Sequence, residues 1–257
     1  MDLELKGKIA VVTGGSDGIG RATALRLAQE GADVAVCARR QEPLDQTAAE
    51  LRKAGAQVLA VSADMSKKAD IDRFIKAVIE RFGRIDILVN NAGTSARGKF
   101  LEIEDDAWSA DLELKVFGAI RCTRIAVPHM KKQGGGRIIN ITISSAKQPG
   151  AESYPTSVSR AAGLALTKAL SKEYAASNIL VNTVCIGKIK SGQHVRRYTR
   201  DGVNAEDYYR QTAKDIPLGR VGEAEEVANV IAFLASDAAS YVTGTSVNLD
   251  GGMSGTL

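Results

Sequence analysis

The fold is decided by the stretch in which Ile9-Ala10-Val11-Val12-Thr13 runs into Gly14-Gly15-Ser16-Asp17-Gly18-Ile19-Gly20. A short β-branched run enters a glycine cluster there, and a helical pattern begins directly after it. Glycine permits a tight turn and lets a phosphate approach the backbone, while the first turn of the helix offers unpaired N–H groups. This order of strand, turn and helix predicts a dinucleotide-binding unit, whereas glycines alone would also suit a plain tight turn.

Strand-like and helix-like segments alternate along the rest of the chain. The predicted strands are Ile9–Thr13, Asp33–Cys37, Gln57–Ser62, Ile85–Asn90, Arg137–Ile143, Leu180–Cys185 and Ser246–Leu249. The predicted helices are Ile19–Glu30, Glu42–Ala54, Lys68–Phe82, Asp105–Lys132, Thr156–Ala176 and Ala224–Ala235. Such alternation indicates βαβ units and a parallel sheet, and the continuously apolar strands indicate that helices cover both faces. We therefore predict one α/β domain over residues 1–257.

The segment from Ile186 to about Pro217 has no clear period and carries glycine, proline and many charges. An irregular segment of this length in a compact domain is usually functional or disordered. It follows the carboxyl end of a predicted strand, where α/β sheets bind their ligands, so residues 186–217 form a candidate substrate loop. Between Lys188 and Arg200 it carries five basic side chains and no acid: Lys188, Lys190, Arg196, Arg197 and Arg200, with His194 beside them.

Composition and charge restrict the class of protein. The chain has 257 residues, 44% of them hydrophobic, and 34 basic against 30 acidic side chains give a formal net charge of +4. These values are typical of a globular protein and give no argument for nucleic acid as a partner. No apolar run approaches the roughly 18 residues of a membrane helix, and no secretion signal is visible. Cys37, Cys122 and Cys185 are an odd number without CxxC spacing, which favours a reduced, cytoplasmic setting and no metal site.

Two arginines stand where the end of the second strand selects the dinucleotide. A carboxylate at this position, about 20 residues after the glycines, would bind the ribose hydroxyls of NAD. The chain has Arg39 and Arg40 there and no acid. Guanidinium groups favour the 2′-phosphate of NADP(H), which is therefore the predicted cofactor; two solvated arginines at a strand end are the alternative.

The chain resembles the short-chain dehydrogenase/reductase family over nearly its whole length. The resemblance rests on Thr13-Gly14-x-x-x-Gly18-Ile19-Gly20, Asp64, Asn90-Asn91-Ala92-Gly93, Val181-Asn182-Thr183-Val184, Tyr241-Val242-Thr243-Gly244 and Asp250-Gly251-Gly252. It implies a single Rossmann-type, doubly wound domain with a seven-stranded parallel sheet and helices on both faces. It also implies a homodimer or, more often, a homotetramer. The family usually has proline where this chain has Ile186.

The resemblance further implies which residues hold the cofactor. They are Gly14, Ser16, Asp17, Gly18 and Ile19 at the pyrophosphate and nearby ribose; Arg39 and Arg40 at the 2′-phosphate; Asp64 and Met65 beside the adenine; Asn91, Ala92 and Gly93 along the ribose; Gly187, Ile189 and Ser191 near the nicotinamide; and Arg160, at the position of the family's ribose-binding lysine.

The family's catalytic Asn-Ser-Tyr-Lys tetrad is substituted in this chain. The tyrosine and the lysine four residues after it correspond to Thr156 and Arg160, the serine to Ile143, and the asparagine to Lys115. Ser144 follows Ile143 directly and is a candidate substitute after a small loop shift. A threonine hydroxyl is too weak an acid to replace the tyrosine without an adjacent base, and arginine stays protonated.

A lysine beside another cation lowers its pKa and becomes able to transfer a proton. We therefore hypothesise that Lys115 donates the proton, that Arg160 polarises the carbonyl or binds a substrate anion, and that Thr156 orients the substrate. Tyr154 is a second candidate acid; the alternative is a loop aromatic that packs near the site.

Three functions stay open from the sequence. The first is NADP(H)-dependent oxidation and reduction of an alcohol/ketone pair. The basic loop, Lys115 and Arg160 favour a small anionic or acyl-carrier substrate for it, as in a 3-oxoacyl reductase, although solvated loop charges are an equal alternative. The second is an NADP(H)-binding or sensor protein without catalysis, and the third is non-redox chemistry on the same fold. No membrane partner is predicted.

Overall fold

The computed structural model describes residues 2–192, 195, 202 and 204–256. It contains a seven-stranded parallel sheet. The strand order is β3 (Val58–Ser62), β2 (Asp33–Ala38), β1 (Ile9–Thr13), β4 (Ile87–Asn90), β6 (Gly136–Ile143), β8 (Ile179–Ile186) and β9 (Ser246–Leu249). The predicted doubly wound α/β domain is confirmed. The strand order reverses between β1 and β4, and ligands of such sheets bind at the carboxyl ends of the strands beside this reversal.

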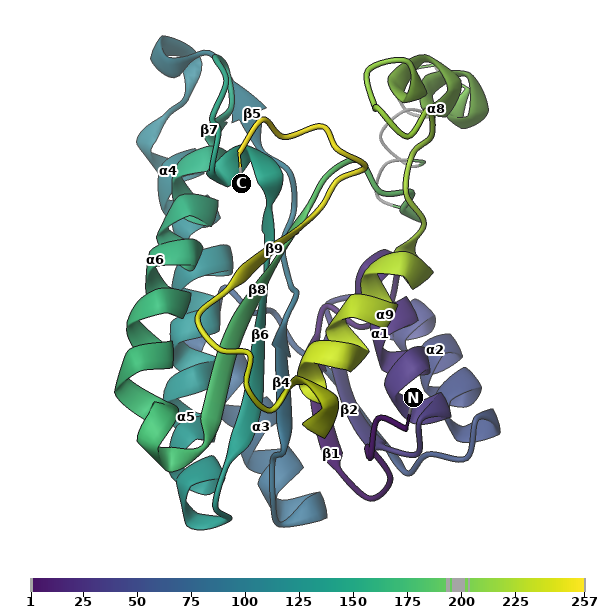
Figure 1. Cartoon of the computed structure of the whole chain (residues 1–257), viewed down its shortest axis with the longest axis vertical. Helices are drawn as coiled ribbons and strands as arrows, with labels where there is room; N and C mark the ends of the chain where they lie inside the picture. The colour runs from purple at the N-terminus through teal and green to yellow at the C-terminus, as the bar shows by residue number, and fades with distance from the viewer. Residues whose placement is uncertain (1, 193–194, 196–201, 203, 257) are drawn as a thin grey trace.

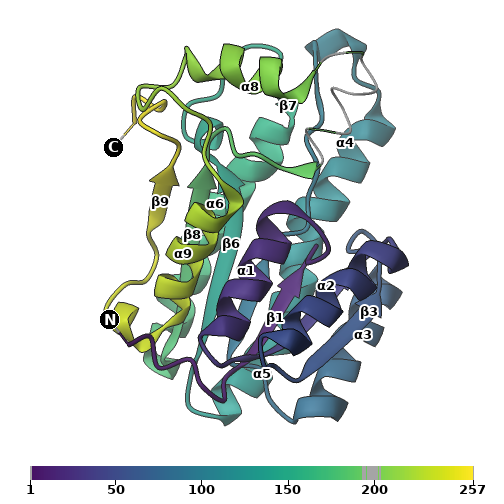
Figure 2. The ribbon, with the colours of Figure 1, turned by 90° about the vertical axis from the view of Figure 1, so that its right-hand side faces the viewer.

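Helices cover both faces of the sheet (Figure 1, Figure 2). On one face lie α1 (Gly18–Gln29), α2 (Gln41–Lys53) and α9 (Ala224–Ala235), and on the other α3 (Lys68–Phe82), α5 (Gly118–Lys132) and α6 (Thr156–Tyr174). Residues of β1 alternate between the two cores: Ala10 and Val12 pack with α1, α2 and α9, whereas Ile9 and Val11 pack with α3 and α5. Because successive strand residues point to opposite faces, a strand covered on both sides is apolar throughout.

The helix predicted from Asp105 to Lys132 is interrupted. Its first part, α4 (Asp105–Leu112), passes into a π-helical turn at Glu113–Phe117 before α5 begins. Lys115 lies in this turn and is buried. A π turn takes up an extra residue within a helix and is frequent at functional sites. The apolar periodicity of the sequence continues across the interruption, which is why the pattern predicted one helix.

A two-stranded antiparallel sheet, absent from the predicted strands, joins the loop after β4 to the start of α6. It pairs β5 (Arg97–Gly98) with β7 (Tyr154–Pro155), so that Arg97 lies opposite Pro155. The Tyr154 ring packs against Phe100 and Trp108, at centroid distances of 5.7 and 6.1 Å.

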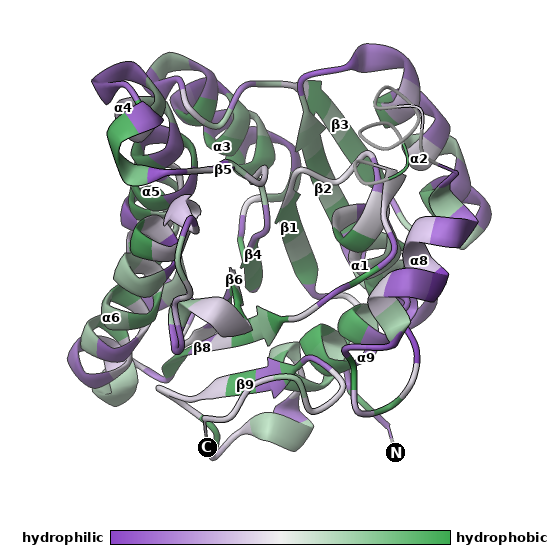
Figure 3. Ribbon diagram, turned by 90° about the horizontal axis from the view of Figure 1, so that it is seen from above, coloured by the Kyte–Doolittle hydropathy of each residue, from purple (hydrophilic) through white to green (hydrophobic). Residues whose placement is uncertain are grey.

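Among its described residues, the candidate substrate loop contains a helix that its lack of period did not predict, α8 (Ala205–Ala213). The Asn204 side chain caps this helix by accepting hydrogen bonds from the N–H groups of Glu206 and Asp207, and Tyr209 is buried with Ile216 and Val221. Figure 3 looks onto the carboxyl edge of the sheet and shows α8 above the layer of α1 and α9. His194, Arg196, Arg197 and Arg200 lie outside the described residues.

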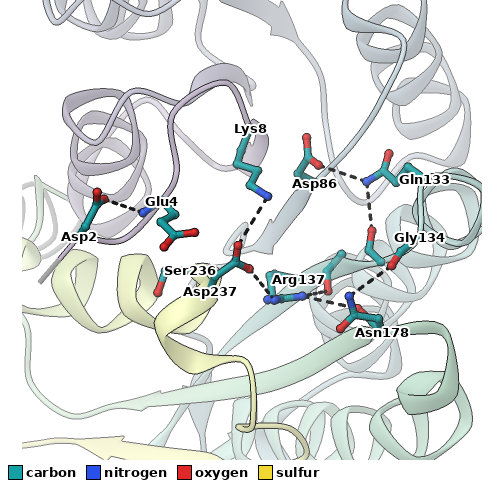
Figure 4. A network of polar contacts seen from close by, with 12 residues as sticks. Asp2, Glu4, Lys8, Asp86, Gln133, Gly134, Arg137, Asn178, Ser236 and Asp237 are labelled. Atoms are coloured by element: carbon teal, nitrogen blue, oxygen red, sulfur yellow. Dashed lines mark hydrogen bonds and ion pairs between the residues drawn. The ribbon is translucent and has the colours of Figure 1, made fainter.

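The opposite end of the sheet carries a network in which cations are matched by acids (Figure 4). Arg137 donates to Asp237 at 2.9 Å, and Lys8 lies 3.9 Å from the same carboxylate. Gln133 donates to Ile85 O at 2.6 Å. The two ion pairs of Asp237 link the turn after α9 to Lys8, directly before β1, and to Arg137 in β6. Within the described part of the chain, no helix is both long and apolar enough to cross a membrane.

Candidate active site

A cavity of about 1120 Å³ opens at the carboxyl edge of the sheet, beside the reversal of strand order. Every cofactor-binding residue named from the sequence lines it, as do Ser144 and Thr156. Lys115 does not line it, because its ammonium donates to Thr156 from behind the cavity wall. Across the described ranges, no group of three or more His, Cys, Asp or Glu side chains has an arrangement that would hold a metal ion.

The glycine turn is held rigidly at one end of this cavity. Gly14 has a φ of +68°, and a Cβ on it would come within 3.0 Å of Ala92 Cα, so no larger residue fits without strain. The Asn91 side-chain amide donates to Thr13 O at 2.9 Å and to Gly14 O at 3.2 Å. Asn91 therefore fixes the shape of the turn. At the start of α1, the Asp17 carboxylate accepts from Gly18 N at 2.7 Å.

Two exposed arginines follow β2 at the same end of the cavity. Arg40 lies 3.7 Å from Asp17, whereas the Arg39 guanidinium has no partner among the described residues. Free guanidinium donors suit a phosphate oxygen. Together with the rigid glycine turn and the N-terminus of α1, this end of the cavity fits a dinucleotide with an additional phosphate on its ribose.

Thr156 opens α6 at the other end of the cavity. Its Oγ1 accepts a hydrogen bond from Lys115 Nζ at 2.7 Å and one from Ala96 N at 3.0 Å. A hydroxyl oxygen has two acceptor lone pairs and one donor hydrogen. Both lone pairs are therefore occupied, and since Thr156 lines the cavity, its hydroxyl hydrogen is available to donate to a ligand there.

A buried chain of polar groups stands behind Thr156. Lys115 Nζ pairs with Asp111 Oδ1, and Asp111 Oδ2 accepts from Ser159 Oγ at 2.6 Å. The side chains of Lys115 and Asp111 are 1% and 2% exposed, so this pair is shielded from solvent. Burial, and then the charge of Arg160, lower the pKa of Lys115 to about 8, while Asp111 acts in the opposite direction.

The Arg160 guanidinium lies on the cavity wall close to this chain. Its Nη1 donates to Ile141 O at 2.5 Å, and its buried Nε has no partner among the described residues. Burial lowers the pKa of Arg160 to about 10, against the opposing effect of Asp111. A Cβ on Gly93 would overlap Arg160 Nη2, so glycine at that position makes room for the guanidinium.

The remaining candidates divide between the cavity and its surroundings. Ser144 and its predecessor Ile143 both line the cavity. Tyr154, the second candidate acid, is held by β7 and its aromatic neighbours and does not line it. Lys188 lines the cavity, whereas Lys190 pairs with Glu223 at 2.6 Å.

Sequence reasoning missed Asp111 and Ser159. The signal for Asp111 was its position four residues before Lys115, the spacing at which side chains meet on one helix face. Such pairs usually lie on the surface, and nothing in the sequence distinguished this one as buried.

Comparison with known proteins agrees with this geometry. A family model described as enoyl-(acyl carrier protein) reductase matches residues 14–254. A 3-oxoacyl-[acyl-carrier-protein] reductase of Synechocystis is 39% identical over 253 residues, covering 97% of this chain and 98% of the relative. The corresponding enzyme of Thermotoga maritima is 36% identical over 254 residues, covering 98% and 99%.

Among solved structures, L-sorbose reductase of Gluconobacter frateurii, complexed with NADPH and L-sorbose, matches with a TM-score of 0.96 and 37% identity, covering 100% of both chains. An actinorhodin polyketide ketoreductase with NADPH matches with a TM-score of 0.91 and 35% identity, covering 97% of this chain and 98% of that one.

The fold, the glycine turn and the cavity define a Rossmann-type α/β protein of the dinucleotide-binding class. The matches narrow that class. This chain belongs to the short-chain dehydrogenase/reductase family. The relatives named here are reductases, and the chain is an oxidoreductase of that family.

Proposed function

We propose that the protein is an NADP(H)-dependent oxidoreductase that interconverts an alcohol and a ketone with a substituted catalytic tetrad. The observation that carries the proposal is the Thr156 hydroxyl, which stands at the family's tyrosine position with both lone pairs occupied and an ammonium behind it. Arg39 and Arg40, together with the NADPH present in two similar structures, support the choice of cofactor.

The cofactor's contribution is hydride transfer to or from the carbonyl carbon of the substrate. In the reducing direction, Thr156 Oγ1 gives its proton to the oxygen that becomes the alcohol. Lys115 then returns a proton to Thr156 across their 2.7 Å hydrogen bond and becomes a neutral amine. Lys115 reaches the substrate only through Thr156, so the threonine is the final donor and the lysine supplies it.

The neighbouring groups hold this relay in its working state. Asp111 keeps the Lys115 ammonium aimed at Thr156 and favours its charged form. The Arg160 guanidinium, on the cavity wall, stabilises negative charge on the reacting oxygen or binds the cofactor ribose. Ser144 takes the place of the missing serine as a donor to the carbonyl.

The substrate we propose is a small anionic ketone or an acyl-carrier-bound one. Lys188 and Arg160 on the cavity wall support an anion, and the 3-oxoacyl reductases among the relatives support an acyl chain. Residues 186–217, including α8, serve as the substrate loop.

The second candidate is an NADP(H)-binding protein without turnover. It is supported by our alignment with the family motifs, in which Lys115, Ile143, Thr156 and Arg160 stand at the four tetrad positions. The two proposals share the cofactor site and differ only in whether a ketone consumes bound NADPH.

Assembly and setting form part of the proposal. The partly exposed apolar side chains of Phe117 and Val158, 43% and 44% exposed, support a homodimer or homotetramer. Cys37, Cys122 and Cys185 are all free thiols, which supports a reduced, cytoplasmic setting.

Calorimetry with NADPH and NADH, on the wild type and Arg39→Ala, tests the proposal first. We expect tight NADPH binding that weakens in the variant, with NADH binding weakly to both. Absorbance at 340 nm during addition of a ketone panel then separates the two candidates. If neither NADPH nor NADH binds, both the oxidoreductase and the NADP(H)-binding protein are ruled out.

A further inference from the structure

Three cations on the cavity wall have no side-chain partner among the described residues. Arg39 lies at the cofactor end, and the other two are Arg97, on β5, and Lys188, two residues after β8. The other described cations near the site are engaged: Arg40 with Asp17, Arg160 with Ile141 O and Lys190 with Glu223. An arginine and a lysine that face one cavity without counter-charges attract an anion.

Rigid backbone positions both side chains beside the reacting group. Ala96 N donates to Thr156 Oγ1, and Arg97 is the next residue, paired through β5 with Pro155. The backbone around Lys188 is held by two hydrogen bonds to Gly222. Gly222 N donates to Lys188 O and Lys190 N donates to Gly222 O, each at 2.9 Å. The backbone of both cations is therefore held by hydrogen bonds in the absence of a ligand.

The acids of the cavity belong to the cofactor half. Of its described lining residues, only Asp17 and Asp64 carry carboxylates. Asp17 caps α1 at the glycine turn, and Asp64 follows β3, the outermost strand of the sheet on the far side of β1. Arg97 and Lys188 therefore face the substrate half without an acid to neutralise them, and Thr94 and Ser95 add polar groups between Gly93 and Arg97.

We propose that Arg97 and Lys188 form a carboxylate-binding subsite, and that the substrate is a short oxo acid rather than a carrier-bound thioester. The inference rests on the proposed function, since the carbonyl is assumed to lie at Thr156. Arg97 directly follows Ala96, whose N–H donates to Thr156 Oγ1, and its side chain lines the same cavity as Thr156, so a small substrate with both a carbonyl and a carboxylate suits the site. The arginine fork binds a carboxylate through parallel hydrogen bonds, and the lysine adds a second charge.

The test compares ketones that differ only in charge. NADPH consumption at 340 nm is measured with 3-oxobutanoate and 4-oxopentanoate, and with their methyl esters, on wild type, Arg97→Gln, Lys188→Gln and the control Lys131→Gln. We expect kcat/KM for the free acids to fall about 10- to 100-fold in the first two variants, the range of one hydrogen bond to a charged group. Their activity on the esters, and all activities of Lys131→Gln, whose ammonium lies over the Tyr174 ring outside the cavity, stay within about twofold of wild type.

Equal activity on acids and esters, or an unchanged acid preference in Arg97→Gln, overturns the subsite. A 3-oxoacyl-carrier thioester reduced far faster than the free acids does the same. If no ketone of either kind is reduced, the redox proposal fails instead. Calorimetric titration of 4-oxopentanoate into NADPH-saturated protein then tests the carboxylate subsite independently of turnover. Binding that is lost in Arg97→Gln supports the subsite, and no binding to the wild type overturns it.

Discussion

Replacing Lys115 by methionine should abolish proton supply while leaving the cofactor site intact. Methionine is similar in length and apolar, so it fills the buried space without the ammonium that donates to Thr156 at 2.7 Å. A positioned acid or base contributes about 10²- to 10⁴-fold to proton transfer, and kcat for ketone reduction should fall by that factor. NADPH affinity should stay unchanged, because Lys115 does not line the cavity.

The pH dependence gives a second, independent measure of the same residue. The pKa of Lys115 lies at about 8, below its ordinary value, because burial and Arg160 disfavour the ammonium. Reduction needs the ammonium, so kcat/KM for reduction should be constant below pH 8 and decline above it. At about pH 9, roughly a tenth of the Lys115 side chains are still protonated. Oxidation needs the neutral amine and should rise through the same range.

The assay is the pH profile of NADPH consumption for wild type, Lys115→Met and Lys131→Met. Lys131 serves as the matched control because it lies on α5 over the Tyr174 ring, outside the cavity. Wild-type rates in Lys115→Met, or a decline near pH 8 that persists in it, would refute the assignment of the proton source.

Three further predictions concern the cofactor site and the surroundings of this relay. Arg39→Ala should weaken NADPH binding roughly 10- to 100-fold in calorimetry and leave NADH binding unchanged; equal loss for both nucleotides contradicts its role at the 2′-phosphate. Gly93→Ala should displace Arg160, whose Nη2 the new Cβ would overlap, and lower turnover far more than thermal stability; a fully active variant would show that the guanidinium position is unimportant. Asp111→Asn removes the charge that favours the Lys115 ammonium, so the decline of reduction should move to a pH below 8, as read from the pH profile; an unmoved profile would leave Asp111 a purely structural role.

The sequence predicted the fold because each layer of the sheet has a local signal. Apolar runs marked the strands, and the glycine turn marked the first crossover. α8 was missed although Asn204, followed by Glu206 and Asp207, is a helix start of the usual type. The sequence showed no apolar periodicity there, because most side chains of α8 are polar or charged and only Tyr209 is buried.

Candidate site residues were predicted by counting along the chain from family motifs, and that method has a physical limit. Counting placed Lys115 at the family's asparagine position but could not show on which side of Thr156 its ammonium lies. That depends on the π turn, which the periodicity of the sequence conceals. The roles of Asp111 and Ser159 could not be predicted either, because they meet only where α4 packs against α6 in the folded chain.

Three of the positions that we align with the tetrad, Lys115, Thr156 and Arg160, form one electrostatic unit together with Asp111. Arginine at position 160 brings a charge that stays on at physiological pH, which lowers the pKa of Lys115 toward the range where a proton moves easily. Asp111 offsets that charge enough to keep the ammonium in a buried position that would otherwise exclude it. Threonine, shorter than tyrosine, leaves room for the ammonium to reach its oxygen from behind. Restoring a single family residue would therefore break the arrangement, because each of these side chains is positioned or charged by the others.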